Sequence, residues 1–176
     1  MMIEKTSYEL AVELGKLALE RGVFLATAES CTAGGVGFEI TAVPGSSQWF
    51  DRGFITYTNE AKHEMLGVRT ETLDAFGAVS CETAREMAVG AVRHSNAQVA
   101  VSITGIAGPG GETPDKPVGT VCFGTAIQHG DAMKVNAWRL QFSGNRDAVR
   151  RQSIDAALWL LCGELTSKTS IFTKEF

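Results

Sequence analysis

Short apolar runs that alternate with helix-forming segments constrain this fold more than any other feature of the sequence. The run Val23–Ala28 is nearly continuous in apolar residues, which is typical of a strand covered on both faces. A second buried strand is predicted over Gln98–Thr104. Both runs are far shorter than the roughly 20 apolar residues that a membrane span needs. Strands of this kind need helices on both sides of their sheet, so the sequence predicts an α/β protein.

Start and stop signals for helices lie between these strands. Thr6 and Glu9 have the spacing of a capping box and predict a helix that ends at Gly22. Ser80 is predicted to cap another helix, whose apolar residues fall on one stripe: Ala84, Met87, Ala88, Ala91 and Val92. The other predicted helices are Thr32–Val43, Asn145–Leu161 and a short helix that Asn59 caps and that carries Ala61, Met65 and Leu66. The other predicted strands are Phe50–Thr58, Val118–Ile127 and Ala132–Phe142.

The last two predicted strands are close enough in the sequence to pair as a hairpin. We therefore expect one domain over residues 1–165, folded as an α/β/α sandwich around a mixed β-sheet. A C-terminal tail is predicted over residues 166–176, where no periodicity is visible.

The charge balance limits the partners of the protein. Sixteen Lys and Arg face twenty Asp and Glu, which gives a net charge of -4. Such a chain has no basic field of the kind that binds nucleic acids or anionic membranes, so neither partner is expected. The first ten residues lack the charged-then-apolar order of a signal peptide, and we expect a cytoplasmic protein.

Cysteine and histidine spacing argues against a metal site or a disulfide framework. The four cysteines form no CxxC pair, and the three histidines show no HxxxH or HxH spacing. The cysteines are predicted to act as small buried hydrophobic residues. No metal is expected.

Three polar segments follow or flank predicted strands, and the ends of such strands are where open α/β sheets bind their ligands. The first contains Glu29, Ser30, Cys31 and Thr32. Ser30 or Thr32 could serve only as a helix cap; alternatively, this helix start offers free N–H donors to an anion or an oxyanion. The segment lacks the GxxxxGK[ST] pattern, which excludes a nucleoside-triphosphate loop of that type.

The second segment joins a turn containing Gly45, Ser46 and Ser47 to Tyr57 and Lys62. Taken singly, these residues would be an ordinary turn, a strand-end aromatic residue and a solvated charge. Taken together, they supply a hydroxyl, a phenol and an amine. A serine can attack a carbonyl carbon if a lysine with a lowered pKa takes its proton.

The third segment is a glycine-rich loop with Thr104, Gly105, Gly108 and Gly110. Such a loop is either a flexible connection or a wall shaped around a small molecule, and it lacks the GxGxxG pattern. Arg146, at the start of the last predicted helix, is expected either to pair with an acidic neighbour or to hold a ligand phosphate.

Several of these segments together resemble one known family. AESCTAG, GSSQWFDRGFITYTNEAK, GAVS, SITGIAGPGG, KPVGTV and FSGNRDAVRRQ occur in the order of the CinA C-terminal-domain family, over about Leu10–Leu161. The resemblance implies a serine amidohydrolase, without metal or cofactor, that hydrolyses nicotinamide mononucleotide (NMN) to nicotinic acid mononucleotide and ammonia. It also implies a catalytic set of Ser47, Tyr57 and Lys62, with Ser30 in the same site.

The sequence departs from the family pattern at three positions. Ala33 stands where glycine is common, Asn145 where Asp is common, and Glu112 where a small residue is common. These departures bear on substrate fit and leave the proposed chemistry intact.

Two alternatives remain open at this point. One is a non-catalytic nucleotide-binding module of the kind that the family's link to competence and DNA damage suggests. The other is an amidase for a different amide. The expected residues that bind substrate are Glu29, Ser30, Cys31, Thr32, Gly45, Ser46, Thr104, Gly105, Gly108, Gly110 and Arg146. A homo-oligomer, with a symmetric dimer favoured, is expected from general frequency.

Overall fold

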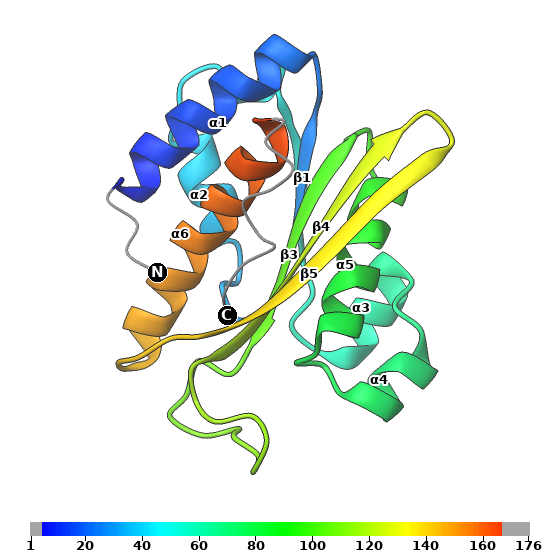
Figure 1. The fold of residues 1–176 in the computed structure, drawn as a ribbon, viewed down its shortest axis with the longest axis vertical. Helices are drawn as coiled ribbons and strands as arrows, with labels where there is room; N and C mark the ends of the chain where they lie inside the picture. Colours follow the sequence, from blue (N-terminus) through cyan, green and yellow to red (C-terminus); the bar gives the residue numbers. More distant parts are fainter. Residues whose placement is uncertain (1–4, 167–176) are drawn as a thin grey trace.

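A five-stranded mixed sheet separates two layers of helices (Figure 1). The computed structural model describes residues 5–166. The strands are β1 (Leu25–Glu29), β2 (Phe50–Ile55), β3 (Val99–Gly105), β4 (Thr120–His129) and β5 (Ala132–Gln141), in the order β2-β1-β3-β4-β5. β1 lies parallel to β2 and β3, whereas β3–β4 and β4–β5 are antiparallel pairs. The predicted mixed α/β architecture is confirmed.

Helices cover both faces of the sheet. They are α1 (Ser7–Arg21), α2 (Gly35–Thr41), α3 (Asn59–Leu66), α4 (Thr70–Phe76), α5 (Cys81–Arg93) and α6 (Arg146–Leu165), with a 3₁₀ turn η1 (Ser46–Gln48). Figure 1 shows α1, α2 and α6 on one face and α3, α4 and α5 on the other. Every residue of β1 is buried, as its continuous apolar run predicted. No helix within residues 5–166 is long and apolar enough to cross a membrane.

The predicted helix signals act as expected. The Thr6 hydroxyl accepts the Glu9 amide hydrogen at 3.2 Å, and the Glu9 carboxylate accepts the Thr6 amide hydrogen at 2.8 Å. Gly22 ends α1 in the left-handed conformation, at φ 61°. Ser80 caps α5 by accepting the Thr83 amide hydrogen at 3.1 Å.

Other boundaries differ from the prediction for local reasons. The cap of α3 is Thr58, whose hydroxyl accepts the Ala61 amide hydrogen, and not Asn59. α4 was not predicted, because its seven residues are too few to show a clear period. The β4–β5 hairpin is tighter than expected, since His129 pairs with Ala132 and leaves only two residues in the turn. Beyond residue 166, the predicted tail lies outside the residues that the structure describes.

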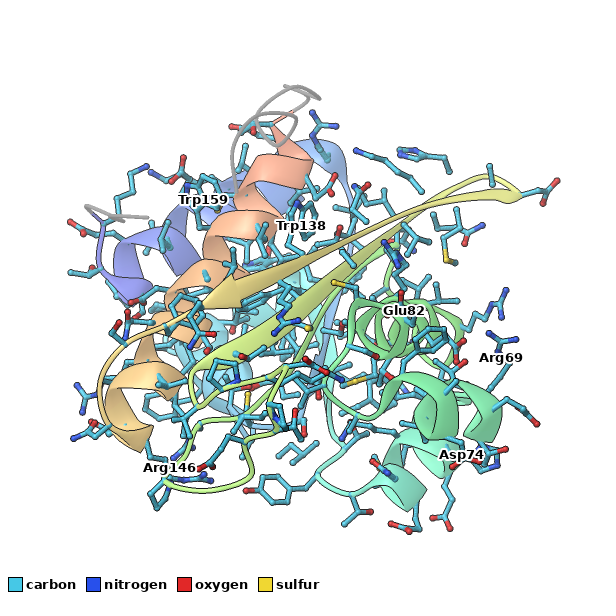
Figure 2. All side chains as sticks on the ribbon, turned by 60° about the horizontal axis from the view of Figure 1, so that its bottom comes forward. Arg69, Asp74, Glu82, Trp138, Arg146 and Trp159 are labelled. Carbon is cyan, nitrogen blue, oxygen red and sulfur yellow. The ribbon has the colours of Figure 1, made fainter. Side chains whose placement is uncertain are left out.

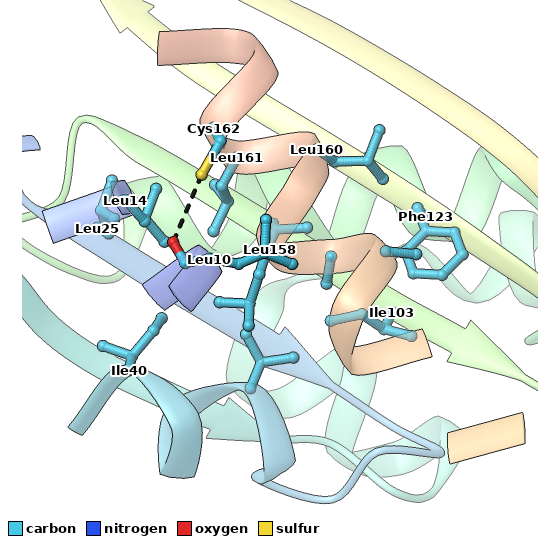
Figure 3. Close-up of a cluster of buried hydrophobic side chains, with 14 of the residues drawn as sticks. Leu10, Leu14, Leu25, Ile40, Ile103, Phe123, Leu158, Leu160, Leu161 and Cys162 are labelled. Carbon is cyan, nitrogen blue, oxygen red and sulfur yellow. Dashed lines mark hydrogen bonds between the residues drawn. The ribbon is translucent and has the colours of Figure 1, made fainter. Parts of the chain in front are cut away.

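The larger hydrophobic core lies between the sheet and the layer of α1 and α6 (Figure 3). Leu10 and Leu14 of α1 and Leu158 and Leu161 of α6 are almost completely buried there. The Cys162 thiol donates to the Leu10 carbonyl oxygen at 3.6 Å, the contact drawn in Figure 3. These apolar stripes hold the two long helices against the strands that carry the site.

A second core holds α3 against α5, and its closest approach is at Gly90. A Cβ atom on Gly90 would lie 2.1 Å from the backbone oxygen of Leu66. Because that atom is backbone, it cannot move aside as a side chain would. We expect Gly90→Ala to lower the free energy of unfolding by about 3 kcal/mol, measured by urea denaturation. Gly110→Ala is the matched control, since a Cβ there meets nothing within 4 Å; equal stability of the two variants would contradict this prediction.

Candidate active site

The carboxyl ends of the three parallel strands meet at one edge of the sheet, the lower edge in Figure 1. Glu29, the last residue of β1, is in register with Ile55 of β2 and Ile103 of β3. Ser30, Thr56 and Thr104 are therefore neighbours directly after those positions. This is the edge at which open α/β sheets bind their ligands.

The Lys62 side chain enters this edge from α3 and contacts Ser30. Its Nζ lies 3.1 Å from the Ser30 hydroxyl oxygen and donates to the Thr56 carbonyl oxygen at 2.8 Å. Lys62 is 1% exposed and Ser30 is 8% exposed. Within residues 5–166 no carboxylate forms an ion pair with Lys62.

Burial lowers the pKa of the Lys62 ammonium below its ordinary value of 10.5, and the neighbouring Cys31 thiol opposes this shift. A buried amine without a counter-charge favours its neutral form. A neutral amine in contact with a hydroxyl can accept its proton, so the Ser30–Lys62 pair has the elements of a nucleophile and its base.

Glu29 is buried at this edge and occupies the start of α2. Its carboxylate accepts five hydrogen bonds of 2.7–3.2 Å, from the Thr27 and Thr32 hydroxyls and from the amides of Gly34, Val36 and Gly37. The sequence predicted that this helix start offers free donors, and that prediction is wrong for these three amides. The carboxylate also explains why α2 begins at Gly35 and not at Thr32.

The turn between Ser30 and α2 keeps other donors free. The Ser30 amide donates to Ile103 and the Ala33 amide donates to Ser30. Neither the Cys31 amide nor the Thr32 amide donates to another residue within 5–166. Ala33 has the left-handed conformation, at φ 50°, which glycine adopts more readily. Two amides that donate to no other residue of 5–166 therefore lie within two residues of the Ser30 hydroxyl.

Two arginines on the first turns of α6 contact residues at this edge, and Figure 2 labels Arg146, the first of them. The Arg146 guanidinium donates to the Gly108 carbonyl oxygen at 2.9 Å and to the Tyr57 hydroxyl at 3.0 Å. Arg150 donates to the Thr32 carbonyl oxygen at 3.2 Å. Neither arginine forms an ion pair with a carboxylate of residues 5–166. Tyr57 is 57% exposed, so its contact with Arg146 lies at the outer rim of the site.

The predicted serine turn lies at the opposite edge. η1 holds Ser46 and Ser47 and follows Gly45, and all three precede β2, whereas Lys62 follows it. β2 has six residues, which span about 20 Å. The Trp49 carbonyl accepts the Leu25 amide hydrogen and so holds this turn beside the start of β1. One chain therefore does not bring Ser47 to Lys62; closeness in sequence was misleading because β2 carries the chain across the sheet.

The glycine-rich loop after β3 is tied to its surroundings by several contacts. The Thr104 hydroxyl donates to the Ala78 carbonyl oxygen at 2.8 Å. A Cβ atom on Gly105 would lie 2.7 Å from the Val121 side chain. Gly108 is buried and contacts Arg146, whereas Gly110 is exposed. Of these loop residues, Gly108 contacts a site residue, Arg146, whereas Gly110 is exposed.

Two contributors were missed by sequence reasoning. Thr56 supplies the carbonyl oxygen that binds Lys62, and no residue type signals a backbone contact of this kind. Arg150 follows Arg146 by four positions, a spacing that puts two residues on the same face of a helix. That spacing could have identified Arg150. Within residues 5–166 no group of three or more His, Cys, Asp or Glu residues could hold a metal ion.

The four thiols are free, and Cys81 is half-buried whereas the other three are buried. The interaction between the Cys81 and Cys122 thiols lowers the pKa of Cys81 and raises that of Cys122. Burial raises the pKa of Cys31 to about 11 and that of Cys162 to about 12. Because the thiolate is the reactive form, we expect iodoacetamide at pH 7.5 to modify Cys81 at least about 10-fold faster than the other thiols. Peptide mass spectrometry measures this; loss of the fast phase in Cys81→Ser is the control, and uniform labelling would contradict it.

Comparisons with known proteins agree on one family. The family model of the CinA C-terminal domain matches residues 7–165. A protein of Shigella flexneri named nicotinamide-nucleotide amidohydrolase PncC is 48% identical over 168 residues, which cover 96% of this chain and 100% of that protein. A putative competence-damage inducible protein of Symbiobacterium thermophilum is 53% identical over 150 residues, which cover 82% of this chain but 35% of that protein. The crystal structure of competence/damage inducible protein CihA from Agrobacterium tumefaciens superimposes with a TM-score of 0.86 at 42% identity, covering 94% of this chain and 99% of that one.

Proposed function

The chain belongs to the CinA C-terminal domain family, as its sequence motifs predicted, and on this premise we propose that it hydrolyses the carboxamide of NMN to nicotinic acid mononucleotide and ammonia. Full-length similarity to the Shigella flexneri nicotinamide-nucleotide amidohydrolase supports this substrate. The observation that carries the proposal is the contact between the buried Lys62 amine and the Ser30 hydroxyl.

In the proposed mechanism Ser30, and not Ser47, is the nucleophile. Neutral Lys62 takes the hydroxyl proton as the Ser30 oxygen bonds to the carboxamide carbon. The tetrahedral intermediate then expels ammonia, which leaves with the proton returned by Lys62. Water, activated by the same amine, cleaves the resulting ester and regenerates the Ser30 hydroxyl. General acid–base assistance of this kind is worth about 10²–10⁴-fold in rate.

The free amides of Cys31 and Thr32 are the proposed donors to the carbonyl oxygen as it gains charge. They follow the nucleophile directly, and no other residue within 5–166 takes their hydrogens, although the Cys31 amide interacts with its own thiol. The Gly45–Ser47 turn, the other predicted source of donors, lies at the opposite edge of the sheet. Preorganised donors of this kind contribute about 10²–10³-fold each.

Arg146 is the proposed partner of the substrate phosphate. It is exposed, it has no carboxylate partner within residues 5–166, and its guanidinium offers the forked donors that suit a phosphate. The Tyr57 hydroxyl accepts a hydrogen bond from the Arg146 guanidinium and holds it in place. This assigns Tyr57 a positioning role and leaves the proton transfers to Lys62.

Ammonia release from NMN by the purified protein tests the proposed function. The expected result is turnover without added metal or cofactor, with nicotinic acid mononucleotide formed in equal amount. Nicotinamide and the riboside are the comparison substrates, and faster turnover of another amide would replace NMN as the substrate. Binding of NMN without turnover would favour the non-catalytic nucleotide-binding module. The dimer and the cytoplasmic location remain proposals, the first of which light scattering would test.

A further inference from the structure

Arg150 differs from Arg146 in its surroundings, although the two residues lie one helical turn apart on α6. The Arg146 side chain is exposed and contacts the outer rim of the site. Arg150 is partly buried, and its Nε atom is shielded from solvent without a hydrogen-bond partner among residues 5–166. Burying a polar atom of a charged group without a partner is costly. Arg150 is therefore not an ordinary solvated surface charge, and its burial indicates a specific role.

The contacts of Arg150 lie behind the turn that follows Ser30. Its guanidinium donates to the Thr32 carbonyl oxygen at 3.2 Å. The same oxygen accepts the Gly35 amide hydrogen at 3.1 Å. The Thr32 hydroxyl donates to Glu29 at 2.7 Å. Thr32 is thus held by a cation on one side and by a carboxylate on the other.

We propose that Arg150 is a positioning residue that acts through Thr32 to orient the Cys31 and Thr32 amides toward the carbonyl oxygen of the substrate. This inference rests on the proposed function and divides the two α6 arginines by role. Arg146 binds the substrate phosphate, and Arg150 supports the turn where negative charge develops during the reaction.

The two roles predict opposite kinetic effects. A group that acts only as charge develops changes kcat, whereas a group that binds substrate and transition state alike changes KM. We expect Arg150→Met to lower kcat about 10²-fold with KM within about twofold of wild type. Arg150→Lys should recover part of this loss, because it restores the charge without the fork. Arg146→Met should raise KM for NMN about 10–100-fold with a smaller effect on kcat.

The riboside of nicotinamide separates the roles further, because it lacks the phosphate. The Arg146→Met penalty should disappear with this substrate, whereas the Arg150→Met penalty should persist. A KM effect of Arg150→Met on NMN that vanishes with the riboside would overturn the inference and make Arg150 a second phosphate ligand. Circular dichroism checks that each variant is folded. If Arg150→Met does not fold, the same kinetic comparison is made with Arg150→Lys.

A readout without NMN distinguishes failure of this inference from failure of the proposed function. A fluorophosphonate probe phosphonylates an activated serine and places its P=O oxygen near the same amides. Intact-mass kinetics should show labelling of Ser30 about 10–100-fold slower in Arg150→Met and unchanged in Arg151→Met, at an exposed arginine of the same helix. Equal labelling rates in both variants would overturn the role of Arg150. Wild-type labelling together with no ammonia release from NMN would instead reject the substrate and leave the role of Arg150 standing.

Discussion

Ser30→Ala is expected to lower kcat for NMN by at least about 10³-fold, because it removes the only hydroxyl that contacts Lys62 within residues 5–166. Substrate binding should change little, since the missing atom acts in the transition state. Ammonia release under saturating NMN measures the loss. The variant should also resist a fluorophosphonate probe that labels the wild-type protein at this residue.

Ser47→Ala is the matched control for that experiment. Ser47 is an exposed serine at the opposite edge of the sheet, and we expect its replacement to leave kcat within about twofold of wild type. A large loss in Ser47→Ala together with an active Ser30→Ala would reverse the assignment. That outcome would also require a second chain to bring Ser47 to a Lys62 side chain.

Lys62→Met is expected to cost activity and add stability. Without the amine no base contacts Ser30, so kcat should fall by about 10³-fold. The buried amine disfavours the folded state at neutral pH, because its pKa is lower in the folded chain than in the unfolded one. Methionine has a similar length and no charge to desolvate, so the thermal midpoint at pH 7 should rise. Lys16→Met, at an exposed position of α1, is the control and should change neither quantity.

The lowered pKa of Lys62 also predicts how stability and kcat/KM depend on pH. Between the lowered pKa of Lys62 and 10.5, the unfolded chain retains a proton that the folded chain has lost. Wild-type stability attributable to Lys62 should therefore rise with pH across that window, and this rise should be absent in Lys62→Met. The rate kcat/KM should rise through the lower pKa, as neutral amine accumulates. A stability difference between wild type and Lys62→Met that does not change with pH would contradict a buried neutral lysine.

The fold was largely predictable because its signals are local. Thr6 and Ser80 begin their helices and Gly22 ends one through contacts with residues a few positions away. The strand β1 was predictable from the nearly continuous apolar run Val23–Ala28, which is also local. The shift of the α2 start was not predictable from helix propensity. It depends on the Glu29 carboxylate folding back onto amides farther along the chain.

The site was only partly predictable because it is built from long-range neighbours. Lys62 and Arg146 were found as charged residues beside polar segments, and the structure places both at the edge expected for an α/β sheet. The direction of β2 decides at which edge of the sheet Ser47 lies, and the sequence alone does not give that direction relative to Ser30 and Lys62. Because β2 crosses the sheet, residues that are close in the sequence lie at opposite edges, and no local sequence pattern shows which edge each residue occupies.

The β4–β5 hairpin has a consequence for how the protein assembles. Its two strands are consecutive and joined by a two-residue turn, and hairpins of this kind form within about 1–10 μs. β1 must instead find β3 across the intervening α2, β2, α3, α4 and α5, a slow search because long loops close late. We therefore expect refolding chains to gain antiparallel strand signal first and the ability to turn over substrate last, so that regained activity reports the final step of the folding reaction.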